Sequence, residues 1–305
     1  MNPSLGIALK LGAVIAFFVM QVLIKFTDGR VPPGEVVFFR SFFAFPVILV
    51  WLAWRRELRV GWRTDKPMSH VWRGVIGTAA MGLGFAGLQL LPLPEVTALS
   101  YAAPILTVIF AAMFLGEQVR LVRVFAVALG MTGVMIVLAP QLTAFTEGEV
   151  GAARALGAVL VLMSTVFMAL AQIFLRKMVA TERAATVVFY FTVSSMLFSL
   201  FTIPFGWVLP SRGDAALLIG AGLLGGAAQG FLTSAYRFAP ASVVAPFDYV
   251  SMIFAIAAGY LLFQEVPTGQ TLAGGALVVA AGLLIIWREA RLGVAREKPR
   301  RAGSE

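Results

Sequence analysis

The chain has 305 residues, of which 60 % are hydrophobic and 13 % are charged, and its formal net charge is +9. A soluble domain carries roughly 25 % charged residues, so this composition excludes an ordinary soluble protein and indicates a chain solvated by lipid. The sequence has no cysteine and one histidine, His70, which excludes a disulfide framework, a thiolate nucleophile and most metal or acid–base constellations.

Ten apolar runs are long enough to cross a bilayer, because a spanning helix needs about 20 residues. We place the spans at 4–26, 33–54, 70–90, 93–114, 119–139, 155–176, 185–207, 214–236, 241–263 and 268–287. The first run lacks a basic n-region and is followed by many similar runs, so we interpret it as a retained span and not as a signal peptide. The predicted fold is an all-α integral membrane protein with ten transmembrane helices and both termini on one side.

The sequence between Pro92 and Glu117 recurs between Pro240 and Glu265, 148 residues later. At this offset Pro, Tyr, Glu and two Gly positions match: Pro92/Pro240, Tyr101/Tyr249, Glu117/Glu265, Gly77/Gly225 and Gly82/Gly230. A second offset of 151 matches Gly6/Gly157 and Gln21/Gln172, and places basic Lys25 over Arg176. The chain is therefore predicted to contain two copies of one five-helix unit. Internal repeats of this kind are typical of transporters whose site lies between the copies.

Lysine and arginine predict the orientation, because cytoplasmic loops carry an excess of them. With both termini inside, eighteen basic residues fall on the inner segments and the tail, and four fall outside: Lys25, Arg30, Arg154 and Arg212. Five spans per repeat put equivalent loops on opposite faces, so the repeats are inverted. The predicted organisation is a first repeat at 1–140, an external linker at 141–153, an inverted second repeat at 154–290 and a basic cytoplasmic tail at 291–305.

Polar groups inside the membrane are costly unless they are paired, which singles out Asp248 in the ninth span. Asp248 either contacts a substrate amine or carries a coupling proton, or it pairs with Lys10 or caps a helix broken near Pro246. Its counterpart in the first repeat is Ser100. The adjacent Tyr101 and Tyr249 should face each other, and either line a substrate cavity or bond backbone groups freed by the nearby prolines, Pro104 and Pro246.

Other polar residues on the spans are candidates for the same cavity. Gln21 and Gln172 should face the cavity or a neighbouring helix. Gln229, Thr233 and Tyr236 share one face of the eighth span by their spacing. The candidate substrate-binding residues are Tyr101, Tyr249, Asp248, Ser100, Gln21, Gln172, Gln229 and Tyr236.

Two further groups are expected to be structural. Arg40, seven residues after Pro33, should tie the second span to carbonyl groups of a neighbouring helix. Glu117 and Glu265 precede the fifth and tenth spans, where a carboxylate suits a helix N-terminus. Glycine ladders on the third and eighth spans permit close helix packing, or form a cavity wall that slides.

The P-x6-R pattern of Pro33–Arg40 and the ALSYAAP…LGE pattern of Ala98–Glu117 resemble EamA-type members of the drug/metabolite transporter superfamily, as does the pattern at Ala245–Glu265. Overall texture and length are most similar to YddG-type exporters of aromatic amino acids. The resemblance implies an inverted five-plus-five repeat, a central cavity and export from the cytoplasm. Met252 stands where the first repeat has Pro104, so the two halves are expected to gate unequally.

The predicted function is a secondary transporter that exports small metabolites, above all aromatic or hydrophobic amino acids, across a bacterial inner membrane by alternating access. The alternatives are another cargo, such as S-adenosylmethionine, a flavin or a cationic drug, or an intramembrane enzyme. The sequence has no GxxxxGK[ST] loop, so energy comes from the substrate gradient or from protons. An intramembrane aspartyl protease would lack its second aspartate, a serine protease would lack a histidine within the membrane, and a zinc enzyme would lack its ligands. We expect no cofactor, no nucleic acid partner and a monomer.

Overall fold

The computed structural model describes residues 3–297 except 55, 57–63, 65, 116–120, 144–147, 180 and 240. In this part of the chain every regular element is helical. The elements are α1 (Pro3–Lys25), α2 (Pro33–Trp54), α3 (Pro67–Leu90), α4 (Leu93–Ser100), α5 (Ala102–Leu115), α6 (Leu121–Thr143), α7 (Glu149–Val179), α8 (Ala184–Ser199), the 3₁₀ helix η2 (Leu200–Phe205), α9 (Arg212–Phe238), α10 (Ala241–Val244), the 3₁₀ helix η3 (Ala245–Tyr249), α11 (Val250–Phe263) and α12 (Gly269–Glu297).

Ten helical segments of the described chain are long and apolar enough to cross a membrane, which confirms the predicted all-α, ten-span fold. Many large apolar side chains point outward, among them Leu209, Leu121 and Trp54, which are 98 %, 86 % and 85 % exposed. Such a surface is stable in hydrocarbon and not in water. Helices reach into the predicted 141–153 linker from both sides, since α6 ends at Thr143 and α7 begins at Glu149.

The fourth and ninth spans both break at their repeated tyrosines. The fourth divides at Tyr101 into α4 and α5, and Pro104 lies in the first turn of α5. The ninth begins as the short α10, continues as η3 around Pro246 and becomes α-helical only at Val250. Proline lacks the amide hydrogen that a continuous helix needs. Each break therefore lies beside a proline, Pro104 or Pro246, and at a repeated tyrosine, although these two prolines are not equivalent in the repeat.

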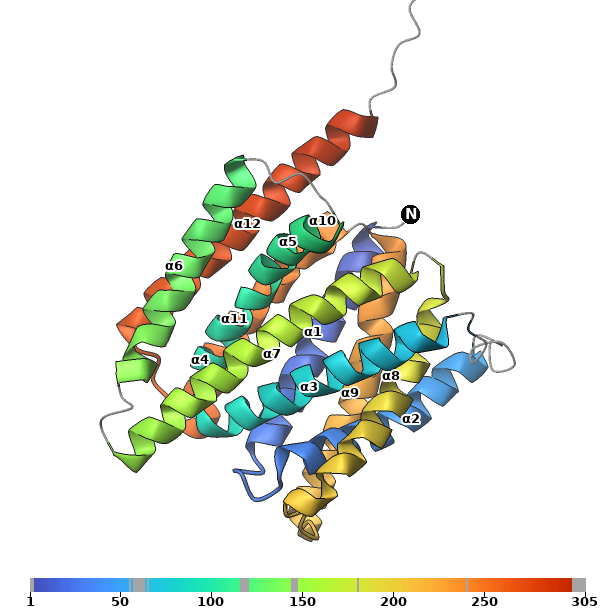
Figure 1. Cartoon of the computed structure of the whole chain (residues 1–305), viewed down its shortest axis with the longest axis vertical. Coiled ribbons are helices and arrows are strands. Elements are labelled where there is room, and N and C mark those ends of the chain that lie inside the picture. The colour runs from blue at the N-terminus through green and yellow to red at the C-terminus, as the bar shows by residue number, and fades with distance from the viewer. Residues whose placement is uncertain are drawn as a thin grey trace, which may run out of the picture.

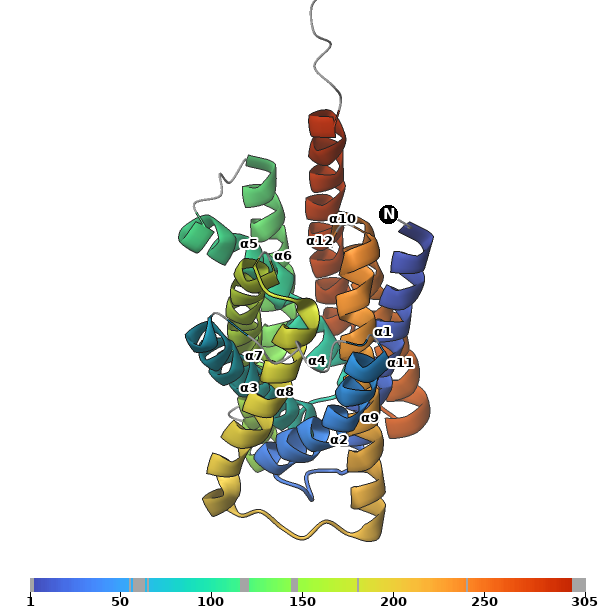
Figure 2. The ribbon, with the colours of Figure 1, turned by 90° about the vertical axis from the view of Figure 1, so that its right-hand side faces the viewer.

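The two halves run in opposite directions. In Figure 1, α1 descends from the marked N-terminus, whereas α7 rises from the lower left toward the same end of the molecule. The end of α12 lies at the end of the molecule where α1 begins, so both termini share one side, as ten spans require. Figures 1 and 2 show α6 beside α12, and a Cβ added at Gly133 would lie only 2.6 Å from the carbonyl oxygen of Gly274.

The same helix interface is built twice. α1 packs along α9, and α7 packs along α3. At the first contact a Cβ on Gly6 would lie 2.6 Å from the Cβ of Ala239, and at the second a Cβ on Gly157 would lie 3.0 Å from Leu91 Cγ. Gly6 and Gly157 are 151 residues apart, and Leu91 and Ala239 are 148 apart. The two sequence offsets therefore correspond to one packing arrangement that is repeated.

Candidate substrate site between the two halves

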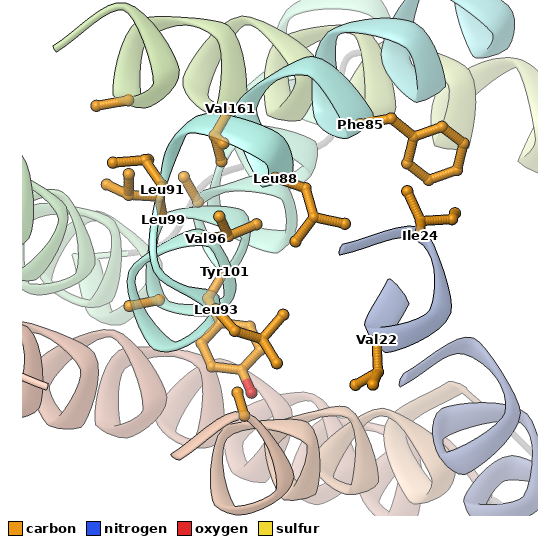
Figure 3. Close-up of a cluster of buried hydrophobic side chains, with 14 of the residues drawn as sticks. Val22, Ile24, Phe85, Leu88, Leu91, Leu93, Val96, Leu99, Tyr101 and Val161 are labelled. Atoms are coloured by element: carbon orange, nitrogen blue, oxygen red, sulfur yellow. The ribbon is translucent and has the colours of Figure 1, made fainter. Parts of the chain in front are cut away.

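The two helix breaks meet at the paired tyrosines. The rings of Tyr101 and Tyr249 pack edge to face with centroids 5.0 Å apart, as their predicted symmetry requires. Tyr101 is 7 % exposed and belongs to the main apolar core. Figure 3 shows its hydroxyl pointing away from α4 toward the ribbon of the second half. Tyr249 reaches α12, where its hydroxyl would clash with any side chain at Gly282.

A short hydrogen-bond chain links Tyr101 to the broken ninth span. The Ser251 hydroxyl donates to the carbonyl oxygen of Asp248 at 2.6 Å, so the Tyr101 hydroxyl donates to Ser251 Oγ, 2.7 Å away. The Tyr101 oxygen also lies 3.4 Å from the carbonyl oxygens of Asp248 and Tyr249. Tyr101 is therefore linked to the backbone at the break through the Ser251 hydroxyl, which is close to one of the two roles that the sequence left open.

Asp248 forms an ion pair with Lys10 on α1, with Asp248 Oδ1 2.7 Å from Lys10 Nζ. The Lys10 side chain is 3 % exposed, whereas 46 % of the Asp248 side chain is exposed. A buried ammonium needs a charged partner, so the predicted alternative of pairing with Lys10 is confirmed. The exposed part of the Asp248 carboxylate remains able to accept a second hydrogen-bond donor, so the pairing leaves a binding role open.

The other predicted site residues are more dispersed. Ser100 donates to the carbonyl oxygen of Val96 at 2.6 Å, an ordinary bond within its own helix. Gln21 and Gln229 are partly exposed and Gln172 is exposed. Within the described chain, no hydrogen bond joins these amides to the tyrosine pair. The side chain of Tyr236, on α9, lies outside the described residues, and so does Glu117.

A second polar cluster, which the sequence did not predict as a site, ties together the ends of α1, α3 and α11. We call the group of Lys25, Glu265, Leu91 and Leu93 the outer cluster, after the predicted orientation. Lys25 Nζ lies 3.0 Å from Glu265 Oε1 and donates to the Leu91 carbonyl oxygen at 2.6 Å. The amide of Leu93 donates to Glu265 Oε2 at 2.7 Å. The repeat contained a signal for this cluster, because a basic residue and a glutamate recur at equivalent positions: Lys25 corresponds to Arg176, and Glu265 to Glu117.

The role of Glu265 is close to the prediction but involves another helix. We expected it to serve the helix that follows it, which is α12. Its carboxylate instead accepts from the first residue of α4, and Thr268 accepts from the Thr271 amide at the start of α12. A carboxylate at a helix N-terminus is favourable in either place. Sequence proximity misled because the fold brings the start of α4 to the end of α11.

The prediction for Arg40 is wrong for two of its nitrogens. Arg40 is 2 % exposed, and its Nε and Nη1 atoms have no hydrogen-bond partner among the residues that the structure describes. They therefore do not tie α2 to backbone carbonyl groups of a neighbour. On α3, Gln89 does make a contact of this kind, because it donates to the carbonyl oxygen of Val31 at 3.0 Å.

Ten spans in two inverted halves, with polar groups gathered where two helices break, define a membrane carrier of small molecules. The chain matches the EamA-like transporter family over residues 4–139 and again over 155–287. It belongs to this family and is a multi-pass membrane transporter of small metabolites.

Several relatives cover nearly the whole chain. The pseudopaline exporter CntI of Pseudomonas aeruginosa is 31 % identical over 90 % of this chain and 94 % of its own length. The riboflavin transporter of Rhizobium johnstonii is 31 % identical over 92 % and 90 %, and the S-adenosylmethionine uptake transporter of Rickettsia prowazekii is 27 % identical over 93 % of each. A solved crystal structure with 19 % identity has a TM-score of 0.63 and covers 96 % of this chain and 99 % of its own, a likeness of fold.

Proposed function

We propose that this protein exports small metabolites with an aromatic or apolar body, first of all aromatic amino acids, across the cytoplasmic membrane by alternating access. The observation that carries the proposal is the meeting of the two broken spans at Tyr101 and Tyr249, whose rings are 5.0 Å apart. In transporters built from inverted repeats, discontinuous helices form the substrate site near the bilayer midplane.

The chemistry of the site suits a zwitterion with a large apolar part. Aromatic rings prefer edge-to-face or offset contact with another ring, and Tyr249 is partly exposed beside Tyr101. Phe18 on α1 and Phe254 on α11 form a further ring contact with centroids 5.7 Å apart. The half-exposed Asp248 carboxylate provides an acceptor for the substrate ammonium group.

Alternating access would rock one half against the other. In the conformation described, the outer cluster holds the ends of α1, α3 and α11 together. By the repeat, Arg176 and Glu117 are the residues that would make the equivalent contact at the inner end in the opposite state. The free energy for export comes from the substrate gradient, as in a uniporter, or from a proton carried by Asp248.

Counterflow in liposomes tests the proposal. The purified protein is reconstituted with unlabelled L-phenylalanine inside, and uptake of labelled L-phenylalanine or L-tryptophan is followed. We expect transient accumulation that Tyr249→Ala reduces strongly. Tyr260→Ala, a change of the same residue type at an exposed position of α11, should leave the rate near that of the wild type. Absence of flux for every amino acid would reject this substrate class, and equal rates for the two variants would reject the tyrosine site.

A second candidate cargo is supported by the names of the relatives. Proteins 27 % and 31 % identical to this chain are an S-adenosylmethionine uptake transporter and a riboflavin transporter. The same liposomes distinguish these cargoes by competition. S-adenosylmethionine or riboflavin that blocks labelled L-phenylalanine flux at lower concentration than L-phenylalanine itself would replace the first candidate, while the proposed site and mechanism would stand.

A further inference from the structure

Two arginines inside the helix bundle each have two guanidinium nitrogens without a partner among the described residues. Nε and Nη1 of Arg40 on α2, and Nε and Nη1 of Arg73 on α3, are buried and have no hydrogen-bond partner among the described residues. Buried polar groups in proteins are almost always bonded, and a buried charge without a partner is far more costly. The described chain therefore supplies no acceptor for these four nitrogens.

The two guanidinium groups lie close to a glycine of a neighbouring helix or to an aromatic ring. Arg40 lies against α9, where a Cβ added at Gly225 would be 2.9 Å from Arg40 Nε. Arg73 lies over the ring of Phe191 on α8, with its guanidinium carbon 4.2 Å from the ring centroid. Helices α2, α3 and α8 pack against one another, so the two guanidinium groups lie on neighbouring helices. No carboxylate of the described residues forms an ion pair with either arginine.

The surroundings of Arg40 and of Phe191 are equivalent in the sequence repeat, but they hold different side chains. Gly77, which contacts Phe191 and Arg73, corresponds to Gly225, which contacts Arg40. By the offset of 151, Arg40 corresponds to Phe191. At Gly225 the neighbouring side chain is thus Arg40. At the equivalent Gly77 it is Phe191, and the guanidinium of Arg73 lies over its ring. The positive charges gather where the halves adjoin.

Two hydroxyl groups extend the same pattern. Ser41 follows Arg40 on α2, and Thr192 follows Phe191 on α8, so these residues are also repeat equivalents. They are 0 % and 1 % exposed, and neither hydroxyl has a hydrogen-bond partner within the described parts of the chain. The packed helices α2, α3 and α8 therefore hold several buried polar groups that the described chain leaves without a partner.

We propose that Arg40 and Arg73 form an anion subsite, which binds a carboxylate of the transported metabolite. Guanidinium groups bind carboxylates through parallel charge-assisted N–H···O bonds, a geometry that lysine does not reproduce. This inference rests on the proposed transport function and names one chemical group of the cargo. It explains why two cationic side chains persist inside a membrane bundle without acidic partners in the chain that is described.

Binding of phenylacetate to the purified full-length protein tests the subsite without transport. Thermal unfolding in detergent is measured against phenylacetate and against phenylacetamide, which has the same ring but no charge, at constant ionic strength. Phenylacetate should raise the melting temperature and phenylacetamide should not. Arg40→Gln and Arg73→Gln should each raise the half-maximal phenylacetate concentration about tenfold or more, as expected for loss of a charge-assisted bond. Arg212→Gln, an exposed arginine at the start of α9, is the matched control.

Three outcomes would overturn the subsite. These are equal stabilisation by the acid and its amide, an unchanged response in both arginine variants, and replacement of phenylacetate by chloride at equal concentration, which would mean an adventitious ion only. If the two glutamine variants fail to fold, Arg40→Met decides the matter without ligand. Removal of an unpaired buried charge should raise the melting temperature of the free protein, whereas loss of a structural anchor would lower it.

The subsite and the proposed cargo fail in different ways. Arginine-dependent binding of phenylacetate, together with no flux of any amino acid, would keep the subsite and reject the aromatic amino acids as cargo. Conversely, L-phenylalanine flux with an unchanged KM in Arg40→Gln and Arg73→Gln would keep the cargo and reject the subsite.

Discussion

The fourth and ninth spans occupy equivalent places in the two halves, yet one is enclosed and the other is exposed. In the most apolar 18-residue stretch of each span, 56 % of the residues are buried in Leu93–Phe114 and 17 % in Pro246–Phe263. The enclosed span resumes as a helix directly after Tyr101, whereas the exposed span passes through the 3₁₀ segment η3. One repeat unit therefore adopts two arrangements in one molecule. In the mechanism that we propose, exchange of these arrangements between the halves opens the opposite side of the membrane.

The largest effect that separates the two spans should come from Asp248. Asp248→Asn removes the carboxylate that neutralises the buried Lys10, and we expect a loss of about 3–5 kcal/mol in the free energy of unfolding. Ser100→Ala, the equivalent change in the fourth span, removes only a bond to the Val96 carbonyl and should cost about 1 kcal/mol. Thermal or denaturant unfolding in detergent measures both. Lys10→Met combined with Asp248→Leu should recover most of the loss, and failure of the double variant to recover any would contradict the ion-pair account.

The next largest effect concerns the outer cluster, which joins the end of the ninth span to the start of the fourth. Lys25→Gln removes the ion pair with Glu265 and the bond to Leu91, so outer-side access should rise. We measure labelling of Gly82→Cys by an impermeant maleimide added outside, since nothing lies within 4 Å of a Cβ at that position. If the outer cluster stabilises the closed outer side by about 1.4 kcal/mol, Lys25→Gln should make the labelling of Gly82→Cys about tenfold faster.

The control for that experiment is Arg30→Gln. Arg30 forms a 2.8 Å ion pair with Asp214 at the predicted outer side, which joins the α1–α2 connection to α9 and leaves both broken spans untouched. Hydrogen bonding to Asp214 raises the pKa of Arg30, so the guanidinium of Arg30 stays protonated at physiological pH. Labelling that rises equally in both variants would mean general loosening and would contradict a specific role for the outer cluster.

A smaller effect is expected at the bond between the two spans. Tyr101→Phe removes the hydroxyl that donates to Ser251 and should destabilise the protein by about 1 kcal/mol. Tyr260→Phe changes an exposed tyrosine of α11 and should have no measurable effect on the melting temperature. If the two variants melt together, the Tyr101 bond contributes nothing to holding the breaks in contact.

The smallest effects should come from the repeated glycines Gly82 and Gly230. A Cβ at either position meets nothing within 4 Å, so alanine should change the free energy of unfolding by less than about 0.5 kcal/mol. At Gly157, by contrast, a Cβ would lie 2.8 Å from the Cβ of Leu90, and overpacking of this kind costs about 1–3 kcal/mol. A large loss at Gly82 or Gly230 would show that these positions are packing sites and do not face open space.

Much of the architecture was predictable because composition and repetition are properties of the chain itself. Hydropathy predicted the ten spans, and the offsets of 148 and 151 predicted two copies of one unit, but not the repeated contacts of Gly6 with Ala239 and of Gly157 with Leu91. The tyrosine contact followed from the same symmetry. The domain limits at 140 and 154 stay a prediction, as do the inward orientation of the termini and the substrate-binding roles of the residues named for the site.

The partners of individual charges were not predictable to the same degree. The sequence named Lys10 as one of several possibilities for Asp248, because a buried charge needs a counter-ion but any span could supply it. Glu265 was assigned to the wrong helix, because its contact with Leu93 depends on how the halves meet. Arg40 was expected to bond to backbone carbonyl groups, since a sequence does not reveal that a buried guanidinium lacks an acceptor.

A cross-link between Lys25→Cys and Glu265→Cys, made with a bismaleimide whose spacer contains a reducible disulfide, tests most directly whether the outer ends of the two halves must separate during transport. The chain has no cysteine of its own, so the reagent joins this pair alone, and its spacer replaces the reach of the two long side chains. In liposomes, we predict that cross-linking stops labelled L-phenylalanine flux and that reduction restores it, while a cross-link between Arg30→Cys and Asp214→Cys leaves flux unchanged. Full flux through a completely cross-linked Lys25→Cys/Glu265→Cys protein would contradict alternating access by these helices.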